Sequence, residues 1–383
     1  MKIKRIASIS VLLLLFFLIP SNVYVARADD LSDSVKDRVN ALDLDGLEEE
    51  FNNSKNGDFD FFTTLNNLLE GKYDGEENVF EYIKGILFSS IGGFMPTIIG
   101  IILVALLCEL VGHIKSKYLS DSVISLVKFV AVLTVILLVL PSLFSIWSNV
   151  KNLIENIGKI SEIMSPIIIT LMVASGGVQS AAIYKPSVVF FTSIVINVFY
   201  SLVLPLIGVL TAFNIMSHFS KEVKVKKFAD FFGGVLKWVF GIIIVVYGIL
   251  ISTQGIIASA TDGISAKVAK YAISNSVPIV GGLIKDGIDV VTAGSLVVKN
   301  ALGIAVVLGL FYIILSPVIE MAVFSLLLKF AAAVTDIFAG ETVSEFLETI
   351  SKTVNYLIAS VLTVGLMAFL TVLLMVLSAN SVI

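Results

Sequence analysis

Charge is what this sequence has least of for its length. Aspartate, glutamate, lysine and arginine make up 15% of its 383 residues, whereas a typical soluble domain carries about 25%. Hydrophobic residues make up 57% of the chain, and its mean hydropathy is +0.99. This composition excludes an ordinary soluble domain. It predicts an all-α protein that crosses a membrane several times, because helices satisfy their own backbone hydrogen bonds in lipid.

Several residue types and motifs that carry chemistry are also scarce or absent. No arginine follows Arg38, which argues against recognition of nucleic acid or phosphate by arginine clusters. The single cysteine, Cys108, excludes an internal disulfide, and the two histidines, His113 and His218, lie far apart. The sequence contains no phosphate-binding loop, no His-Glu-x-x-His and no Gly-x-Ser-x-Gly. We therefore expect no enzyme activity, no cofactor, no metal site and no nucleic-acid partner.

Residues 1–28 are predicted to be a cleaved secretory signal peptide. The first five residues include three basic ones, and residues 9–19 form an apolar core that is short for a span. Ala26-Arg27-Ala28 then fits the small-x-small pattern of a cleavage site. An uncleaved anchor is the alternative. In both cases the chain from Asp29 onward is expected outside the cytoplasm.

After this segment, charge is distributed unevenly. Residues 29–85 hold sixteen acidic residues against five basic ones, a net charge of −11, and are predicted to form an acidic extracytoplasmic region. A region of this size is marginal on its own, so we expect it to pack on the rest of the protein or on a partner. Residues 86–383 are predicted to form a polytopic membrane domain. Its hydrophobic stretches are 86–111, 123–146, 163–183, 187–216, 232–257, 301–338 and 354–378.

Two of these stretches do not have the length of a single span, which needs about 20 residues. The stretch 163–183 has a short apolar core interrupted by Ser175-Gly176-Gly177, so we interpret it as re-entrant or interfacial. The stretch 301–338 would reach about 57 Å as one helix. With Pro317 and Glu320 near its middle, it is interpreted as a helical hairpin. The prediction is about seven spans plus re-entrant or amphipathic segments.

The lysines set the expected orientation. With the acidic region outside, the first span places Lys115 and Lys117 in the cytoplasm, as the positive-inside rule requires. The four lysines of residues 221–227 also lie inside only if 163–183 does not cross the membrane. The segment 258–300 is then outside or re-entrant. A hairpin at 301–338 places the acidic residues that follow it outside, namely Glu341, Glu345 and Glu348.

The segment 258–303 is amphipathic and broken. Pro278 and the pair Gly281-Gly282 interrupt the backbone, which predicts two short helices that pack against or dip into the membrane bundle. After the break, apolar residues recur at helical spacing. Polar side chains gather on the other side, with the candidates for a pore or partner face being Lys285, Asp286, Asp289 and Lys299. The alternative is a surface helix at the lipid boundary.

Glycines at intervals of seven residues indicate helix packing. Four of them fall in the stretch 232–257, and two more follow the Pro278 break: Gly234, Gly241, Gly248, Gly255, Gly287 and Gly294. On a helix such a repeat forms a nearly continuous stripe of small residues. In membranes these stripes allow close approach of another helix, so we interpret them as candidate packing or assembly sites, with chance as the alternative.

The same broken segment resembles a known family. Residues 270–282 read KYAISNSVPIVGG, residues 286–289 read DGID, and residues 294–303 read GSLVVKNALG. With the order of signal, acidic N-terminal region and glycine-rich polytopic region, these blocks resemble the stage III sporulation protein AE family of endospore-forming bacteria. The resemblance covers essentially the whole chain.

The resemblance implies a function. It implies a subunit of a multiprotein channel or secretion complex in the mother-cell membrane around the forespore, needed for forespore development. Implied partners are the other stage III A proteins, including a separate ATPase, and stage II protein Q, besides membrane lipid. The family has no established catalytic residues to transfer.

A self-contained secondary transporter is the alternative function. Transporters often place paired broken helices at the middle of the membrane. The break at Pro278 to Gly282 and the weak stretch from Ser165 to Gln179 are the candidates for such a pair. Glu320 is the best single candidate for a role in conduction or coupling, since an ionisable group within a span is costly. A plain hairpin turn at the interface is the alternative for Glu320.

Overall fold

The computed structural model describes residues 39, 42–53, 59–73, 79–113, 121–217, 225–276, 280–338 and 341–378, and the side chains of 255–289 are outside this description. All regular structure in these residues is helical, with no strand among them, which confirms the predicted all-α class. The predicted signal peptide, residues 1–28, lies outside the described residues.

Two short helices precede a bundle of much longer ones. The short helices are α3 (Asp45–Asn53) and α4 (Phe61–Leu69). The long elements are α5 (Val79–His113), α7 (Asp121–Ala174), α11 (Val225–Ser276), α12 (Val280–Phe338) and α13 (Glu341–Leu377). Between α7 and α11, the chain forms one further rod from α8 (Val178–Val189), a π-helical stretch (Phe190–Val195), α9 (Ile196–Val198), a second π-helical stretch (Phe199–Val203) and α10 (Leu204–Ser217).

Six of these rods are long and apolar enough to cross a membrane. The candidate spans within the described residues are Val79–Val111, Ser125–Ala174, Val178–Ser217, Lys227–Gln254, Val290–Ile337 and Val343–Leu377. The 59 residues of α12 extend about 88 Å at 1.5 Å per residue. That is nearly three times a hydrocarbon core of about 30 Å, so the bundle reaches well beyond the membrane.

The structure has six candidate spans where the sequence suggested about seven. The predicted hairpin at 301–338 is wrong, because α12 runs through Pro317 without interruption. Proline is tolerated within membrane helices when neighbouring groups support the backbone. The stretch 163–183 is likewise no separate segment. It contains the end of α7 and the start of α8, joined by a turn in which Gly176 adopts a φ of 89°.

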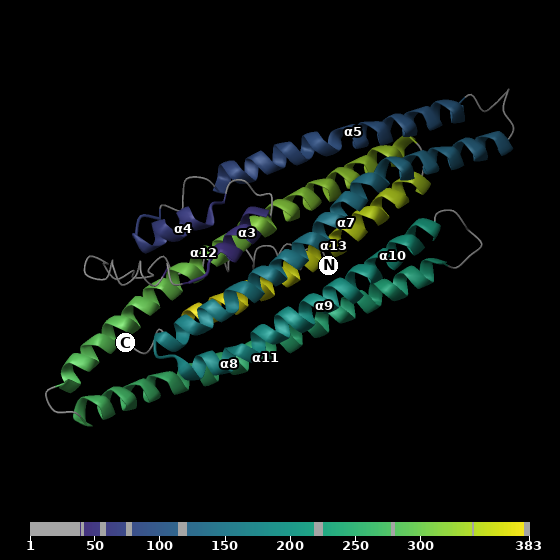
Figure 1. The fold of residues 1–383 in the computed structure, drawn as a ribbon. Coiled ribbons are helices and arrows are strands. Elements are labelled where there is room, and N and C mark those ends of the chain that lie inside the picture. Colours follow the sequence, from purple (N-terminus) through teal and green to yellow (C-terminus); the bar gives the residue numbers. More distant parts are fainter. Residues whose placement is uncertain are drawn as a thin grey trace.

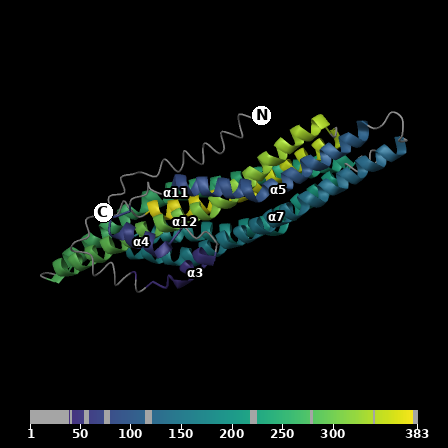
Figure 2. The ribbon, with the colours of Figure 1, turned by 90° about the horizontal axis from the view of Figure 1, so that it is seen from above.

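The rods alternate in direction along an elongated bundle, as both views show (Figures 1 and 2). The C-terminal ends of α5, α10 and α12 lie together at one end (Figure 1). The turn between α7 and α8 and the facing ends of α11 and α12 lie at the other (Figure 1). The end of α10 and the start of α11 are therefore at the same end as the start of α13 (Figure 1). The sequence placed the start of α13 opposite the segment that joins α10 to α11, but it lies on the same side as these two helix ends.

Helices α12 and α13 form the centre of the bundle. They run antiparallel, so the early part of α12 packs on the late part of α13. Gly365 of α13 faces Ile314, and a Cβ added there would lie 2.6 Å from Ile314 Cδ1. Gly303 of α12 is packed still more tightly against Val376. These glycines allow the two helices to approach closely.

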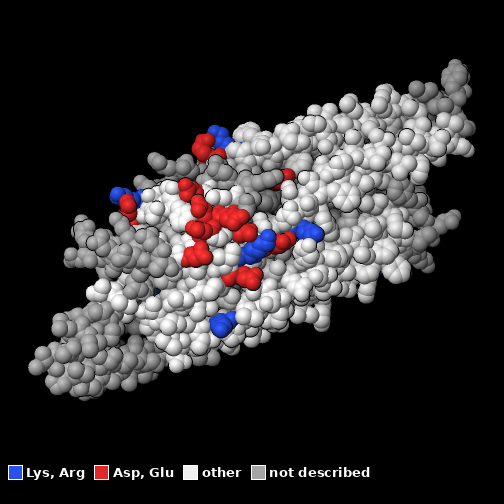
Figure 3. All heavy atoms as spheres, in the orientation of Figure 1, with Lys and Arg blue, Asp and Glu red and all other residues white. Residues whose placement is uncertain are grey.

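The acidic N-terminal region packs on the bundle, as its size predicts. Phe51 stacks on Phe61 with ring centroids 5.1 Å apart, and Phe59 stacks on Tyr312 of α12 at 5.5 Å. Asp60 caps α4, accepting a hydrogen bond of 2.9 Å from the backbone N–H of Thr63. That bond lowers the pKa of the Asp60 carboxyl. Acidic side chains gather on the face formed by α3 and the middle of α7 (Figure 3), where Lys159 pairs with Glu155 at 3.4 Å.

Candidate functional site

A groove between α5 and α12 forms a concave site in the described part of the protein. These two helices run in the same direction and are held together by aromatic contacts at two levels. Tyr82 meets Tyr312 with ring centroids 5.1 Å apart, and its hydroxyl donates to the Tyr312 carbonyl oxygen at 3.4 Å. Twelve residues further along each helix, Phe94 meets Phe324 at 4.6 Å. The two contacts lie about 18 Å apart along the helices.

Between these two aromatic contacts most of the lining residues on α5 are small. They include Gly85 and Gly93, and a Cβ added at either glycine would have no other group within 4 Å. Because the aromatic rings at both ends hold the helices apart, these small residues do not fill the space between them, and a cavity of about 840 Å³ remains. Its lining residues are Glu81, Tyr82, Gly85, Ile86, Ser89, Ser90, Gly93, Phe94, Tyr312, Ser316 and Glu320.

Glu320 contributes a charge to this groove from within the candidate span of α12, Val290–Ile337. It is partly buried and lines the cavity, one turn after Ser316 and one turn before Phe324. Within the described residues its carboxylate has no hydrogen bond or ion pair. Glu81, at the end of the groove near Tyr82, differs because it is paired with Lys84 at 3.5 Å. Glu320 thus stays a candidate, and the structure supplies the surroundings that the sequence did not.

The other residues that line the groove with Glu320 were not predicted from the sequence. Sequence reasoning missed Tyr82, Ser90 and Tyr312, because the pairing of α5 with α12 joins residues more than two hundred positions apart. One local signal was available. Small residues recur on α5 at positions 85, 89 and 93, which is one face of a helix.

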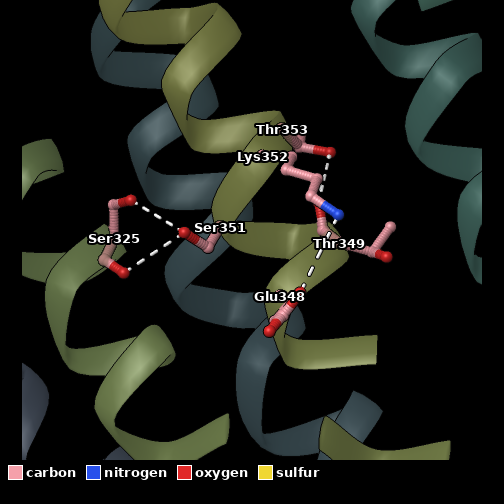
Figure 4. A network of polar contacts seen from close by, with 6 residues as sticks. All are labelled: Ser325, Glu348, Thr349, Ser351, Lys352 and Thr353. Carbon is pink, nitrogen blue, oxygen red and sulfur yellow. Dashed lines mark hydrogen bonds and ion pairs between the residues drawn. The ribbon is translucent and has the colours of Figure 1, made fainter. Parts of the chain in front are cut away.

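Beside the groove, hydroxyl groups connect α12 to α13. Ser325 and Ser351 lie 2.8 Å apart, and the Ser351 hydroxyl also donates to the Ser325 carbonyl oxygen at 3.2 Å. The Ser325 hydroxyl also donates to Asn355 Oδ1 at 3.2 Å. Figure 4 shows Ser325 and Ser351 facing each other across the two helices, with Glu348 and Lys352 on another side of α13. Such bonds fix the register of two membrane helices, so α12 presents Glu320 at a defined position.

Lys299 is not on an open face, contrary to expectation. Its side chain is fully buried, and its ammonium group donates to the carbonyl oxygen of Ser378, directly after the end of α13. Thr292 and Ser295 on the same side of α12 are buried too, while Val290 and Val291 are exposed. The polar side of this part of α12 therefore turns into the bundle, where buried polar groups find partners, and the apolar side turns outward.

The glycine repeat of α11 faces outward. Gly234, Gly241 and Gly248 are exposed, and a Cβ added at any of them would have no other group within 4 Å. Large apolar side chains, including Trp238 and Val245, are exposed on the same helix. Gly294 differs, since it is buried within the bundle. The stripe therefore does not pack within this chain.

The predicted break at Pro278 falls partly outside the described residues. Helix α11 ends at Ser276 and α12 begins at Val280, so two helices do meet there, but both are continuations of long rods, not short helices. Gly281 and Gly282 belong to the first turn of α12. The side chains of Gly255, Lys285, Asp286, Gly287 and Asp289 lie outside the description.

These features define a class of protein: a multi-pass α-helical membrane protein with a carboxylate-bearing groove between two of its helices. Comparison with known proteins identifies the family. The family model for stage III sporulation protein AE matches residues 59–379, and the chain belongs to that family. It is 25% identical over 280 residues to stage III sporulation protein AE of Bacillus subtilis strain 168. The aligned residues cover 73% of this chain and 70% of the Bacillus subtilis protein. No solved structure matches the chain.

Family membership confirms the resemblance drawn from the sequence. It associates the protein with sporulation. The six candidate spans agree with a multi-pass membrane protein.

Proposed function

We propose that this protein is a non-enzymatic membrane subunit of a channel or secretion complex between mother cell and forespore, needed for forespore development. Its location is the mother-cell membrane around the forespore, with the mature N-terminus outside the cytoplasm. Its partners are the other stage III A proteins and stage II protein Q. The observation that carries this proposal is the family match over residues 59–379 of a chain with six candidate spans.

Helix α11 supports assembly with other subunits. In the most apolar window of α11 only 17% of the residues are buried within the chain, against 56% for α13. Gly241 and Gly248 leave open space along this exposed side. Small residues on an exposed membrane helix allow a second helix to approach closely. We assign this side of α11 to contact with a partner subunit.

The test uses the double variant Gly241→Leu/Gly248→Leu in a sporulating strain lacking the natural gene. Leucines on the exposed face leave the fold intact but block close approach of a partner helix. We expect the purified variant to unfold at the wild-type temperature, while co-purification of stage III A proteins falls at least about tenfold, equivalent to 1.4 kcal/mol. The number of heat-resistant spores should fall with it.

Gly92→Leu is the matched control, because Gly92 is an equally open glycine on α5. It should co-purify normally. Loss of co-purification in the control as well would contradict the assignment of α11 to contact with a partner subunit. Normal sporulation of a strain without the gene would contradict the proposed function itself.

The self-contained transporter loses its main structural support. It required paired helix breaks near the middle of the membrane. The turn at Ser175–Gly177 and the facing ends of α11 and α12 both lie at one end of the bundle (Figure 1). A transporter also predicts expression in growing cells, whereas the proposed subunit is expected only once sporulation begins.

A further inference from the structure

We infer that the groove between α5 and α12 binds an organic cation, an alkylammonium or guanidinium group, through Glu320. This inference does not rest on the proposed function, because it concerns a site within the single chain. It is carried by three observations together: a preformed cavity, a carboxylate within a span that has no hydrogen bond or ion pair among the described residues, and walls of aromatic and hydroxyl-bearing side chains.

The groove is preformed because α5 and α12 are fixed at both of its ends. The Tyr82–Tyr312 and Phe94–Phe324 contacts set the spacing of the helices, and the glycines between them leave the space unfilled. Small-molecule sites have volumes of about 300–1,000 Å³ with a few convergent polar groups on mainly apolar walls. The cavity of about 840 Å³ lies within that range.

The sign of the ligand follows from the charges that line the groove. Among the described residues that line it, the ionisable side chains besides two tyrosines are the carboxylates of Glu81 and Glu320, and none of these lining residues is basic. Glu81 is paired with Lys84, which leaves the charge of Glu320. A carboxylate within a span costs several kcal/mol unless it takes up a proton or a cation or hydrogen bonds compensate its charge. A bound cation would supply that compensation.

The shape and composition of the groove favour an organic cation over a metal ion. Metal ions of the calcium or magnesium type need six or more oxygen ligands converging at about 2–2.6 Å. In the described residues no group of three or more acidic, histidine or cysteine side chains could hold a metal ion. The groove offers Glu320 for the charge, Ser90 and Ser316 as hydrogen-bonding groups, and Ile86 and Phe94 for a carbon chain. Aromatic rings additionally attract ammonium and guanidinium groups.

The test measures binding to the purified full-length chain in detergent micelles. The probe is n-butylammonium, with 1-butanol at the same concentration as the neutral isostere and sodium chloride as the ionic-strength control. Ligand that binds only the folded state raises the unfolding temperature by mass action. We expect stabilisation by butylammonium alone. A second arm uses Nα-acetyl-lysine amide, which keeps the charged side-chain ammonium group. Tighter binding of this probe than of butylammonium would indicate that the natural cation is a basic side chain of a polypeptide.

Two variants locate the site by independent means. Glu320→Gln removes the charge at almost unchanged volume, and Gly93→Leu fills the groove without changing any charge. Each should weaken butylammonium binding at least about tenfold. Glu348→Gln is the matched control, because Glu348 lies on the exposed side of α13 and pairs with Lys352 at 3.9 Å. It should bind like the natural chain. If one groove variant fails to fold, the other decides.

Equal stabilisation by butanol and butylammonium would overturn the inference, as would unchanged binding in the two groove variants. Neither result would affect the proposed function, which is tested by co-purification and spore counts. Conversely, a groove variant that co-purifies normally with the stage III A proteins but does not bind butylammonium would support the cation site. That result would hold whatever the function of the complex.

Discussion

A single buried lysine shows how strongly side-chain surroundings decide a residue's role. Lys299 has 0% exposure, and its ammonium group donates to a carbonyl oxygen just past the end of α13. The last carbonyls of a helix lack partners within the helix and carry partial negative charge, so a cation there is stabilised. The sequence around Lys299 suggested that its side chain lies on an open polar face. In the structure the side chain instead links α12 to α13.

Replacing Lys299 tests this link at the residue scale. Lys299→Ala leaves a cavity and a carbonyl without its donor, so we expect a loss of about 2–4 kcal/mol in the free energy of unfolding. Lys299→Met restores most of the volume. We therefore expect it to lower the free energy of unfolding by only about 1 kcal/mol, for the lost hydrogen bond. Thermal unfolding of the purified protein in detergent measures both.

Lys352→Ala is the control for that series, since the Lys352 side chain is 65% exposed and its partner is a surface carboxylate. Exposed pairs contribute about 0–1 kcal/mol. If Lys352→Ala lowered the free energy of unfolding as much as Lys299→Ala, the contact of Lys299 with the Ser378 carbonyl oxygen would not be a particular source of stability.

At the scale of elements, α12 and α13 depend on small residues where their backbones approach. Gly365 faces Ile314, and Gly303 faces Val376. The Ser325–Ser351 hydrogen bonds secure the same pair of helices further along. In lipid there is little hydrophobic drive between helices, so close packing and hydrogen bonds must hold them. The register of α12 against α13 in turn sets where Glu320 stands in the groove.

Gly365→Leu should therefore disturb this pair of helices. A Cβ there would already lie 2.6 Å from Ile314 Cδ1, so a leucine forces the helices apart. We expect a loss of about 1–3 kcal/mol in the free energy of unfolding, typical of overpacked cores. Gly234→Leu, at an open glycine of α11, should change it by less than about 0.5 kcal/mol. Equal effects of the two substitutions would contradict the packing described for α12 and α13.

At the scale of the whole molecule, the alternation of six rods sets which ends share a side of the membrane. The starts of α11 and α13 lie at one end, and the turn between α7 and α8 lies at the other (Figure 1). From the positive-inside rule we predict that the end holding the starts of α11 and α13 is the cytoplasmic one. The acidic start of α13 is then expected in the cytoplasm too, in contrast to the placement that the sequence suggested.

Single cysteines in a Cys108→Ala background test this topology. An impermeant thiol reagent applied to intact growing cells that express the protein in their surface membrane should label Gln179→Cys, at the start of α8. It should label Lys221→Cys and Glu345→Cys only after lysis. Labelling of Glu345→Cys in intact cells would restore the hairpin within α12, and labelling of Lys221→Cys would restore 163–183 as a separate span.

How much could be predicted differs between the fold and the candidate site. The helical class and the presence of several candidate membrane spans follow from composition and local pattern, which the bilayer makes decisive because it excludes unpaired backbone. Glu320 was also recognisable, because a charge within a long apolar run is rare. Its surroundings were not, because no local signal relates Tyr82 to Tyr312.

The sequence by itself thus determined that the chain is a helical membrane protein and which ionisable residue within its spans is unusual. Only the tertiary structure decided that α12 continues through Pro317, that Lys299 turns inward, and that the glycines of α11 stay open. The physical reason is that each of these depends on which helix lies opposite. Packing partners are set by contacts between distant segments, whereas hydropathy and periodicity are properties of neighbouring residues.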